Sequence, residues 1–101
     1  MESYAWRHDP DESVPEGAQI DLLLERSDGV TNVCEMKFCA DRYVMDARAE
    51  SEISRKLTVF QAVTKTRQTL HLTLVTSFGL MRNTHSGRVQ SEVTLDDLFK
   101  E

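Results

Sequence analysis

The sequence lacks long apolar runs and shows no sign of a membrane segment. Of its 101 residues, 40% are hydrophobic and 29% are charged. No segment approaches the roughly 20 apolar residues that a membrane span requires. Met1 is followed by Glu2 and Ser3, without the basic start and apolar stretch of a secretory signal. We therefore expect one cytoplasmic domain over residues 1–101, with no membrane partner.

Cysteine and histidine are also scarce. Cys34 and Cys39 lie five residues apart in a run that we expect to be extended, so their side chains point to opposite faces and cannot easily bond to each other. The three histidines, His8, His71 and His85, occur singly. Nothing resembles the paired Cys/His spacing of a structural zinc site.

Charge is unevenly distributed along the chain. The formal net charge is −5, but residues 42–88 contain eight basic and three acidic residues, so this segment is +5 and the remainder is −10. The overall charge argues against indiscriminate nucleic-acid binding. The basic central segment fits either a surface that faces phosphates or a solvated helix of mixed charge.

Alternating apolar residues predict a β-hairpin over residues 17–38. Residues 19–26 alternate in strand fashion, and residues 30–38 repeat the pattern. Between them, the segment 27–29 ends in Gly29, which can adopt positive φ in a tight connection. If these three residues form the loop, Asp21 lies across from Glu35; a shift of two residues places it across from Lys37.

Either register places three charged residues on one face of the hairpin and an apolar set on the other. The charged residues are Asp21, Glu35 and Lys37. The apolar set, which we expect to face the core, comprises Ile20, Leu22, Leu24, Cys34, Met36 and Phe38. A one-residue slip would separate the charged residues, but it would also break up the apolar face.

The rest of the sequence predicts an α/β sandwich. Residues 47–66 have the three-and-four spacing of a helix, whose apolar face we expect to pack on Leu22, Leu24 and Met36. The apolar residues of that helix face include Ile53, Leu57 and Phe60. Residues 4–8, 70–76 and 89–93 are predicted strands, residues 9–17 a loop, and Thr94 with Asp97 a cap that opens a terminal helix.

The shared face of Asp21, Glu35 and Lys37 suggests phosphodiester chemistry. Two facing carboxylates repel, and a divalent cation that prefers oxygen ligands, Mg²⁺ or Mn²⁺, relieves the repulsion. Such an ion polarises a phosphate oxygen and lowers the pKa of a bound water, while a lysine stabilises developing negative charge. The alternative is a set of cross-strand ion pairs on a solvated sheet.

These segments resemble a known superfamily. The runs GAQIDLLL (17–24) and CEMKF (34–38) look like the core of PD-(D/E)XK nucleases. Together with RKL (55–57), TKT (64–66) and VTLDDLF (93–99), they resemble the C-terminal nuclease-like domain of bacterial and archaeal P-loop AAA-type ATPases. The proline of the motif is replaced by Ile20. The ATPase module is absent, because no GxxxxGK(S/T) sequence occurs.

The resemblance implies a restriction-endonuclease-like core with a mixed sheet that lacks the usual N-terminal helix. It also implies a single domain that is detached or truncated from a larger ATPase. It implies a metal held by Asp21, Glu35 and the carbonyl of Met36, with Lys37 as the catalytic cation. Related nucleases often direct a polar residue of the helix after the motif toward the site, and Gln61 has that position, although a single helical glutamine is usually a surface residue. Arg55 and Lys56 meet either phosphates or water, with water favoured.

The resemblance leaves two functions open. One is metal-dependent hydrolysis of DNA, retained, weakened or lost; the other is a non-catalytic interaction module that served an ATPase partner. Because the first strand lacks a covering helix, we also expect apolar surface, an open sheet edge and a two-fold homodimer.

Overall fold

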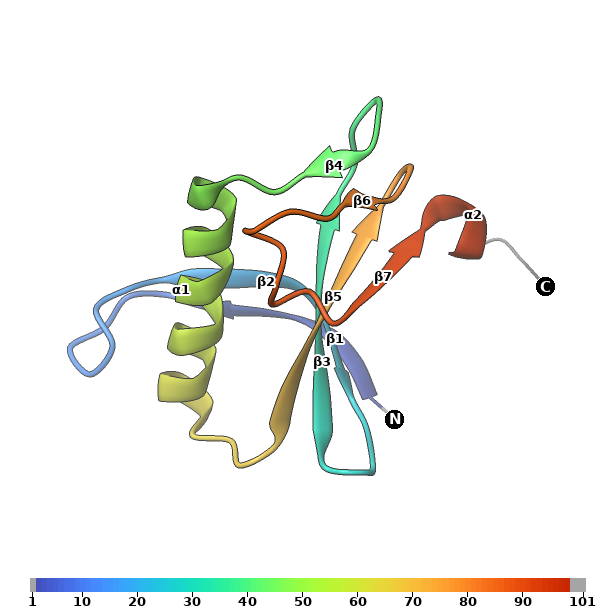
Figure 1. The fold of residues 1–101 in the computed structure, drawn as a ribbon. Coiled ribbons are helices and arrows are strands. Elements are labelled where there is room, and N and C mark those ends of the chain that lie inside the picture. Colours follow the sequence, from blue (N-terminus) through green and yellow to red (C-terminus); the bar gives the residue numbers. More distant parts are fainter. Residues whose placement is uncertain (1, 99–101) are drawn as a thin grey trace.

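Seven strands and two helices lie along residues 2–98, the part of the chain that this computed structural model describes (Figure 1). The strands are β1 (Glu2–His8), β2 (Ala18–Glu25), β3 (Val30–Lys37), β4 (Tyr43–Val44), β5 (Thr69–Thr76), β6 (Leu80–Met81) and β7 (Ser91–Thr94). The helices are α1 (Ala47–Thr64) and α2 (Leu95–Leu98). Phe99, the last residue of the 93–99 run, lies outside the described residues.

Five strands form a mixed sheet in the order β1-β2-β3-β5-β7. β1, β2 and β3 are antiparallel neighbours, whereas β3, β5 and β7 run parallel. A parallel neighbour requires a crossover, and α1 supplies it between β3 and β5 while lying across one face of the sheet (Figure 1). β4 and β6 form a separate parallel pair. The expected α/β class with a mixed sheet is confirmed.

The β2–β3 hairpin adopts the register that requires a loop of three residues. The Arg26 N–H donates to the Val30 carbonyl at 3.0 Å, and Gly29 has a φ of 82°, which a residue with a side chain rarely adopts. Leu22 pairs with Cys34 in the ladder that follows. Of the two predicted registers, this is the one that directs Asp21 toward Glu35.

One extra residue in β2 changes which side chains are buried. Tyr4 of β1 pairs with Leu23, but Trp6, two residues on, pairs with Ile20, which is three residues away. This irregularity is a β-bulge, which reverses the in-and-out alternation of the bulged strand. Ile20 and Leu23 therefore both enter the core, although their odd spacing would place them on opposite faces of a regular strand.

The prediction that α1 packs on the face carrying Leu22, Leu24 and Met36 is wrong. The core joins Leu23 and Val33 to residues of α1, whereas Met36 is 39% exposed and Leu22 and Leu24 are half-buried. Of the apolar set expected inside, Ile20 and Cys34 are buried and Phe38 is exposed. The helix thus covers the face that also carries Glu35. Because of the bulge, the Ile20 side chain points to that face as well.

Polar caps set the two ends of α1. Asp46 precedes the helix, and its Oδ1 accepts from the Ala49 N–H at 2.8 Å. At the other end Lys65 has a left-handed φ of 54°, and its N–H donates to the Gln61 carbonyl at 2.9 Å. The helix therefore ends two residues before the predicted limit. Among the described residues no helix could span a membrane.

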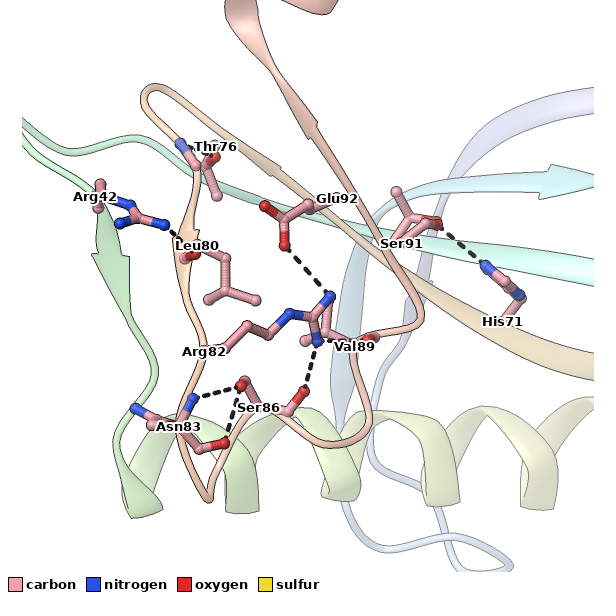
Figure 2. A network of polar contacts seen from close by, with 12 residues as sticks. Arg42, His71, Thr76, Leu80, Arg82, Asn83, Ser86, Val89, Ser91 and Glu92 are labelled. Atoms are coloured by element: carbon pink, nitrogen blue, oxygen red, sulfur yellow. Dashed lines mark hydrogen bonds and ion pairs between the residues drawn. The ribbon is translucent and has the colours of Figure 1, made fainter.

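Arg82 fixes the loop between β6 and β7 (Figure 2). Its Nη1 donates to the carbonyls of Ser86 (3.2 Å) and Val89 (2.8 Å), and its Nη2 lies 3.3 Å from Glu92 Oε2. Val89, expected to begin a strand, is a buried loop residue, because β7 begins at Ser91.

The predicted cap of the terminal helix is confirmed. The Thr94 N–H donates to Asp97 Oδ2 at 3.0 Å, and the Asp97 N–H donates to Thr94 Oγ1 at 3.3 Å. This reciprocal pair of bonds satisfies two donors at the start of α2, as in a capping box.

Candidate active site

Asp21 and Glu35 meet across the β2–β3 hairpin, beside the bulge. The Asp21 N–H donates to Glu35 Oε2 at 3.3 Å, and Asp21 Oδ2 accepts from the Met36 N–H at 2.9 Å. The Asp21 carboxylate therefore accepts the hydrogen bond that a backbone carbonyl of β2 would accept from Met36 in a regular ladder. This contact lies in a region where the bulge has interrupted regular pairing. The Glu35 carboxylate thus contacts the Asp21 backbone, and the Asp21 carboxylate contacts the Met36 backbone.

Glu35 is buried and paired with a lysine from α1. Its side chain is 1% exposed, and its Oε1 lies 2.6 Å from Lys56 Nζ, whose side chain is 17% exposed. A buried carboxylate needs a counter-charge, because burial removes the water that would otherwise stabilise it. Lys56 supplies that charge. The prediction that Lys56 meets either phosphates or water is therefore wrong, because its ammonium forms an intramolecular ion pair.

A pocket of about 450 Å³ opens next to Glu35 at the start of α1. Its lining is mostly polar and of mixed charge: Glu35, Lys37, Tyr43, Val44, Asp46, Arg48, Ala49, Glu52 and Ile53. Asp21 lies beside Glu35 but outside this lining. The pocket thus brings together Glu35 and Lys37 of the predicted triad, and adds residues from β4 and the first turns of α1.

The pocket contains two cations without a fixed partner. Among the side chains that the structure describes, neither Lys37 nor Arg48 has an ion pair or hydrogen bond, whereas Glu52 is held by Arg55 at 2.5 Å. This hydrogen bond lowers the pKa of Glu52. Lys37 and Arg48 are therefore available to an anion that enters the pocket.

Tyr43 contributes a neutral hydroxyl to the same pocket. Burial, reinforced by the nearby Asp46, Cys39 and Glu35, raises the pKa of Tyr43 above its ordinary value. The phenol consequently stays protonated at physiological pH and remains available as a hydrogen-bond donor.

Gln61 and Arg55 lie outside the pocket lining and bond to backbone carbonyls. Gln61 Nε2 donates to the Thr66 carbonyl at 2.5 Å, so the side chain helps to close the C-terminal end of α1. Arg55 Nη1 donates to the Gly17 carbonyl, which ties α1 to the start of β2. Both side chains are engaged in interactions that support the fold.

The donor set fits a hard divalent cation, with one complication. Carboxylates on two adjacent strands, next to a backbone peptide, are the oxygen ligands that Mg²⁺ and Mn²⁺ prefer. Within residues 2–98 no group of three or more His, Cys, Asp or Glu is placed to hold a metal, so two carboxylates and a carbonyl would have to suffice. The complication is that both oxygens of Glu35 are already engaged, Oε1 by Lys56 and Oε2 by the Asp21 N–H.

The sequence contained a signal for the Lys56 contact. Lys56 follows Ile53 by three residues and precedes Phe60 by four, so it lies in the apolar stripe of the helix. Because buried charges are paired, a lysine in such a stripe indicates an acid on the element that the helix covers. The sequence contained no comparable signal for Tyr43 and Arg48. They reach the pocket through the path that the chain takes after β3, which local patterns do not indicate.

Comparison with known proteins assigns no family to this chain. A scan against protein-family models, a search of curated proteins and a search of solved structures each gave no match. The geometry of the site therefore carries the functional argument.

Proposed function

We propose that this chain hydrolyses DNA phosphodiesters with Mg²⁺ or Mn²⁺ held by Asp21, Glu35 and the carbonyl of Met36. The observation that supports the proposal is the 3.3 Å bond from the Asp21 backbone N–H to Glu35 Oε2, which places the two acidic residues next to each other beside a pocket that Lys37 lines. Adjacent carboxylates repel each other, and a divalent cation relieves that repulsion. As part of the proposal, the mixed sheet is the core of a restriction-endonuclease-like fold.

Three pocket residues have a role beside the ion in this proposal. The ion would polarise a phosphate oxygen and lower the pKa of a bound water. Lys37 would stabilise the negative charge that develops on the phosphate, and Arg48 would hold a phosphate oxygen by paired hydrogen bonds. Tyr43 would donate a hydrogen bond from its protonated hydroxyl.

A second candidate function is supported by the Lys56–Glu35 ion pair. An ammonium at 2.6 Å compensates the buried carboxylate without any metal. In that case the chain is a non-catalytic interaction module that keeps a nuclease-like fold. Its partner would be an ATPase, the class of protein that the sequence resemblance implies. The two candidates differ in whether a divalent ion binds at Glu35.

Replacing Lys37 by alanine is expected to lower the DNA cleavage rate about 100-fold or more while Mn²⁺ still binds. The loss has that size because removing one group that stabilises transition-state charge typically costs two to three orders of magnitude in rate. Mn²⁺ binding should remain, because Lys37 supplies no oxygen ligand. The measurement is cleavage of linear duplex, single-stranded and branched DNA with Mg²⁺ and with Mn²⁺, next to calorimetry of metal binding.

Lys65→Asn is the matched control. It removes the same charge at the far end of α1, where asparagine tolerates the left-handed backbone. This control should cleave like the parent. Equal cleavage by the parent, Lys37→Ala and Lys65→Asn would show that the pocket is not the active site. Absence of cleavage by the parent, with no Mn²⁺ binding, would favour the interaction module.

A further inference from the structure

Exposed apolar side chains gather at one end of the sheet. Among the side chains that the structure describes, six large apolar ones are exposed, and four of these lie in the segments that follow β3 and β5. We call these four the apolar rim: Phe38, Val44, Phe78 and Met81. The two most exposed of the six are Phe78 (61%) and Phe38 (55%). Single exposed apolar residues are normal, whereas a group of them marks a binding surface.

Hydrogen bonds hold the segments of the apolar rim next to each other. The Cys39 N–H donates to Ser77 Oγ at 3.2 Å. Cys39 directly follows Phe38, and Ser77 directly precedes Phe78. The other two members of the rim are register partners in the parallel pair β4–β6. Figure 1 shows the loops after β3 and β5 projecting from the same end of the sheet, with β4 and β6 beside them.

The apolar rim borders the pocket of the candidate active site, and Val44 belongs to both. Lys37 and Arg48 line this pocket, and within the described part of the chain neither side chain has an ion pair or hydrogen bond. Arg42 adds a third positive charge. Its Nη2 donates to the Leu80 carbonyl at 3.2 Å (Figure 2), which uses one of the five N–H donors of a guanidinium. Aromatic rings and cations therefore share this end of the molecule.

We propose that this end of the molecule binds unpaired DNA, an inference that rests on the proposed function and names the substrate of the same site. Bases stack on Phe38 and Phe78 of the apolar rim. Phosphates contact Lys37, Arg42 and Arg48. Surfaces that bind single strands combine cations that follow the backbone with aromatic rings on which bases stack. In a duplex the bases stack on one another, so only an unpaired strand can use both features.

Charge favours a nucleic acid over an apolar protein surface as the occupant. The whole chain has a net charge of −5, but residues 37–48 contain three cations and two acids. Both acids already accept backbone hydrogen bonds, because Asp46 caps α1 and Asp41 Oδ1 accepts from the Arg42 N–H at 2.7 Å. An apolar partner would leave the cations beside it without a counter-charge, whereas phosphates supply one.

Three phosphate contacts predict weak binding that depends on salt. For single strands, the logarithm of the binding constant falls with the logarithm of the salt concentration by about 0.7 for each contact. We therefore expect a slope of about −2 and a dissociation constant of about 1–100 μM at physiological salt. Loss of one stacked base should weaken binding by about fivefold to 150-fold.

Fluorescence anisotropy of a labelled oligothymidine of about 12 nucleotides tests the proposal. EDTA is present, so that binding is measured without metal and without cleavage. The parent should bind the single strand at least about tenfold more tightly than a duplex of the same length. Phe78→Ala should weaken binding of the single strand about tenfold. Phe78→Leu should weaken it as much, because leucine keeps an apolar surface but offers no aromatic face, and Phe78→Trp should restore it.

Arg48→Met tests the phosphate contacts separately. It should weaken binding and reduce the size of the salt slope by about 0.7. Lys65→Asn is the matched control, because it removes the same charge at the opposite end of α1. This control should keep the affinity and the salt slope of the parent. Circular dichroism checks that each variant is folded.

The outcomes separate this inference from the proposed hydrolysis. Absence of binding by the parent at several hundred micromolar, or equal affinity of the parent, Phe78→Ala and Phe78→Leu, overturns the binding of unpaired DNA. A duplex bound as tightly as the single strand also overturns it, even if the parent cleaves DNA with Mn²⁺. Binding that Phe78→Leu weakens and Phe78→Trp restores supports it, and lack of cleavage by that parent counts against the hydrolysis alone.

Discussion

Lys56→Met is expected to destabilise the protein by about 3–5 kcal/mol. Lys56 Nζ lies 2.6 Å from Glu35 Oε1, and the Glu35 side chain is 1% exposed. Methionine fills the space of the lysine stem but leaves a buried carboxylate without its counter-charge. The free energy of unfolding from urea titration measures the effect, and the double variant Glu35→Gln with Lys56→Met should recover most of the loss, because it removes both charges.

The same variant separates the two candidate functions. If Glu35 is a metal ligand, Mn²⁺ should stabilise Lys56→Met more than it stabilises the parent, because the ion then replaces the missing cation. At a free concentration of 100 times the dissociation constant, binding adds about 2.7 kcal/mol. If Mn²⁺ leaves the unfolding midpoint of Lys56→Met unchanged, the pair is structural, and the interaction module is the better description.

Phe60→Ala is expected to cost about 3–5 kcal/mol of stability. Phe60 is 3% exposed in the core under α1, and its ring meets Trp6 edge-on, with centroids 5.0 Å apart. Removing it empties a large volume between the helix and β1, which the surrounding side chains fill only in part. Trp6 is the only tryptophan in the sequence, so its fluorescence reports unfolding of this contact directly.

Phe78→Ala provides the matched control for this loss. Phe78 is 61% exposed in the loop after β5, so its truncation should change stability by no more than about 0.5 kcal/mol. A Phe60→Ala variant as stable as Phe78→Ala would mean that α1 does not pack on the side of the sheet that carries Trp6, Leu23 and Val33.

The hairpin could be predicted in detail because its signals are local. Gly29 permits the tight loop, and the Arg26–Val30 bond fixes the register that directs Asp21 toward Glu35. Each of these features depends on residues close together in the chain. The order of the longer strands and of α1 followed from the same kind of local periodicity, whereas the two-residue strands β4 and β6 were not predicted.

The covered face could not be predicted, because it depends on how β1 pairs. The bulge in β2 is defined by Trp6 pairing with Ile20 while Tyr4 pairs with Leu23. Within residues 17–38 the sequence departs from strict alternation at Leu23, but this departure does not locate a bulge. Strict alternation favoured the side of Leu22 and Leu24 as the core. The core instead lies on the face that carries Glu35. Glu35, which was expected on a polar surface, is therefore buried and charge-paired.

Mn²⁺ calorimetry on the parent and on Asp21→Asn tests the proposed metal site most directly. Asparagine keeps the shape of the side chain, and its oxygen can still accept from the Met36 N–H, but it removes a charged ligand from beside Glu35. The parent should bind about one Mn²⁺ per chain, and Asp21→Asn should bind it at least about tenfold more weakly. No heat of binding for the parent at millimolar Mn²⁺, or equal affinity in both proteins, would contradict a metal held by Asp21 and Glu35.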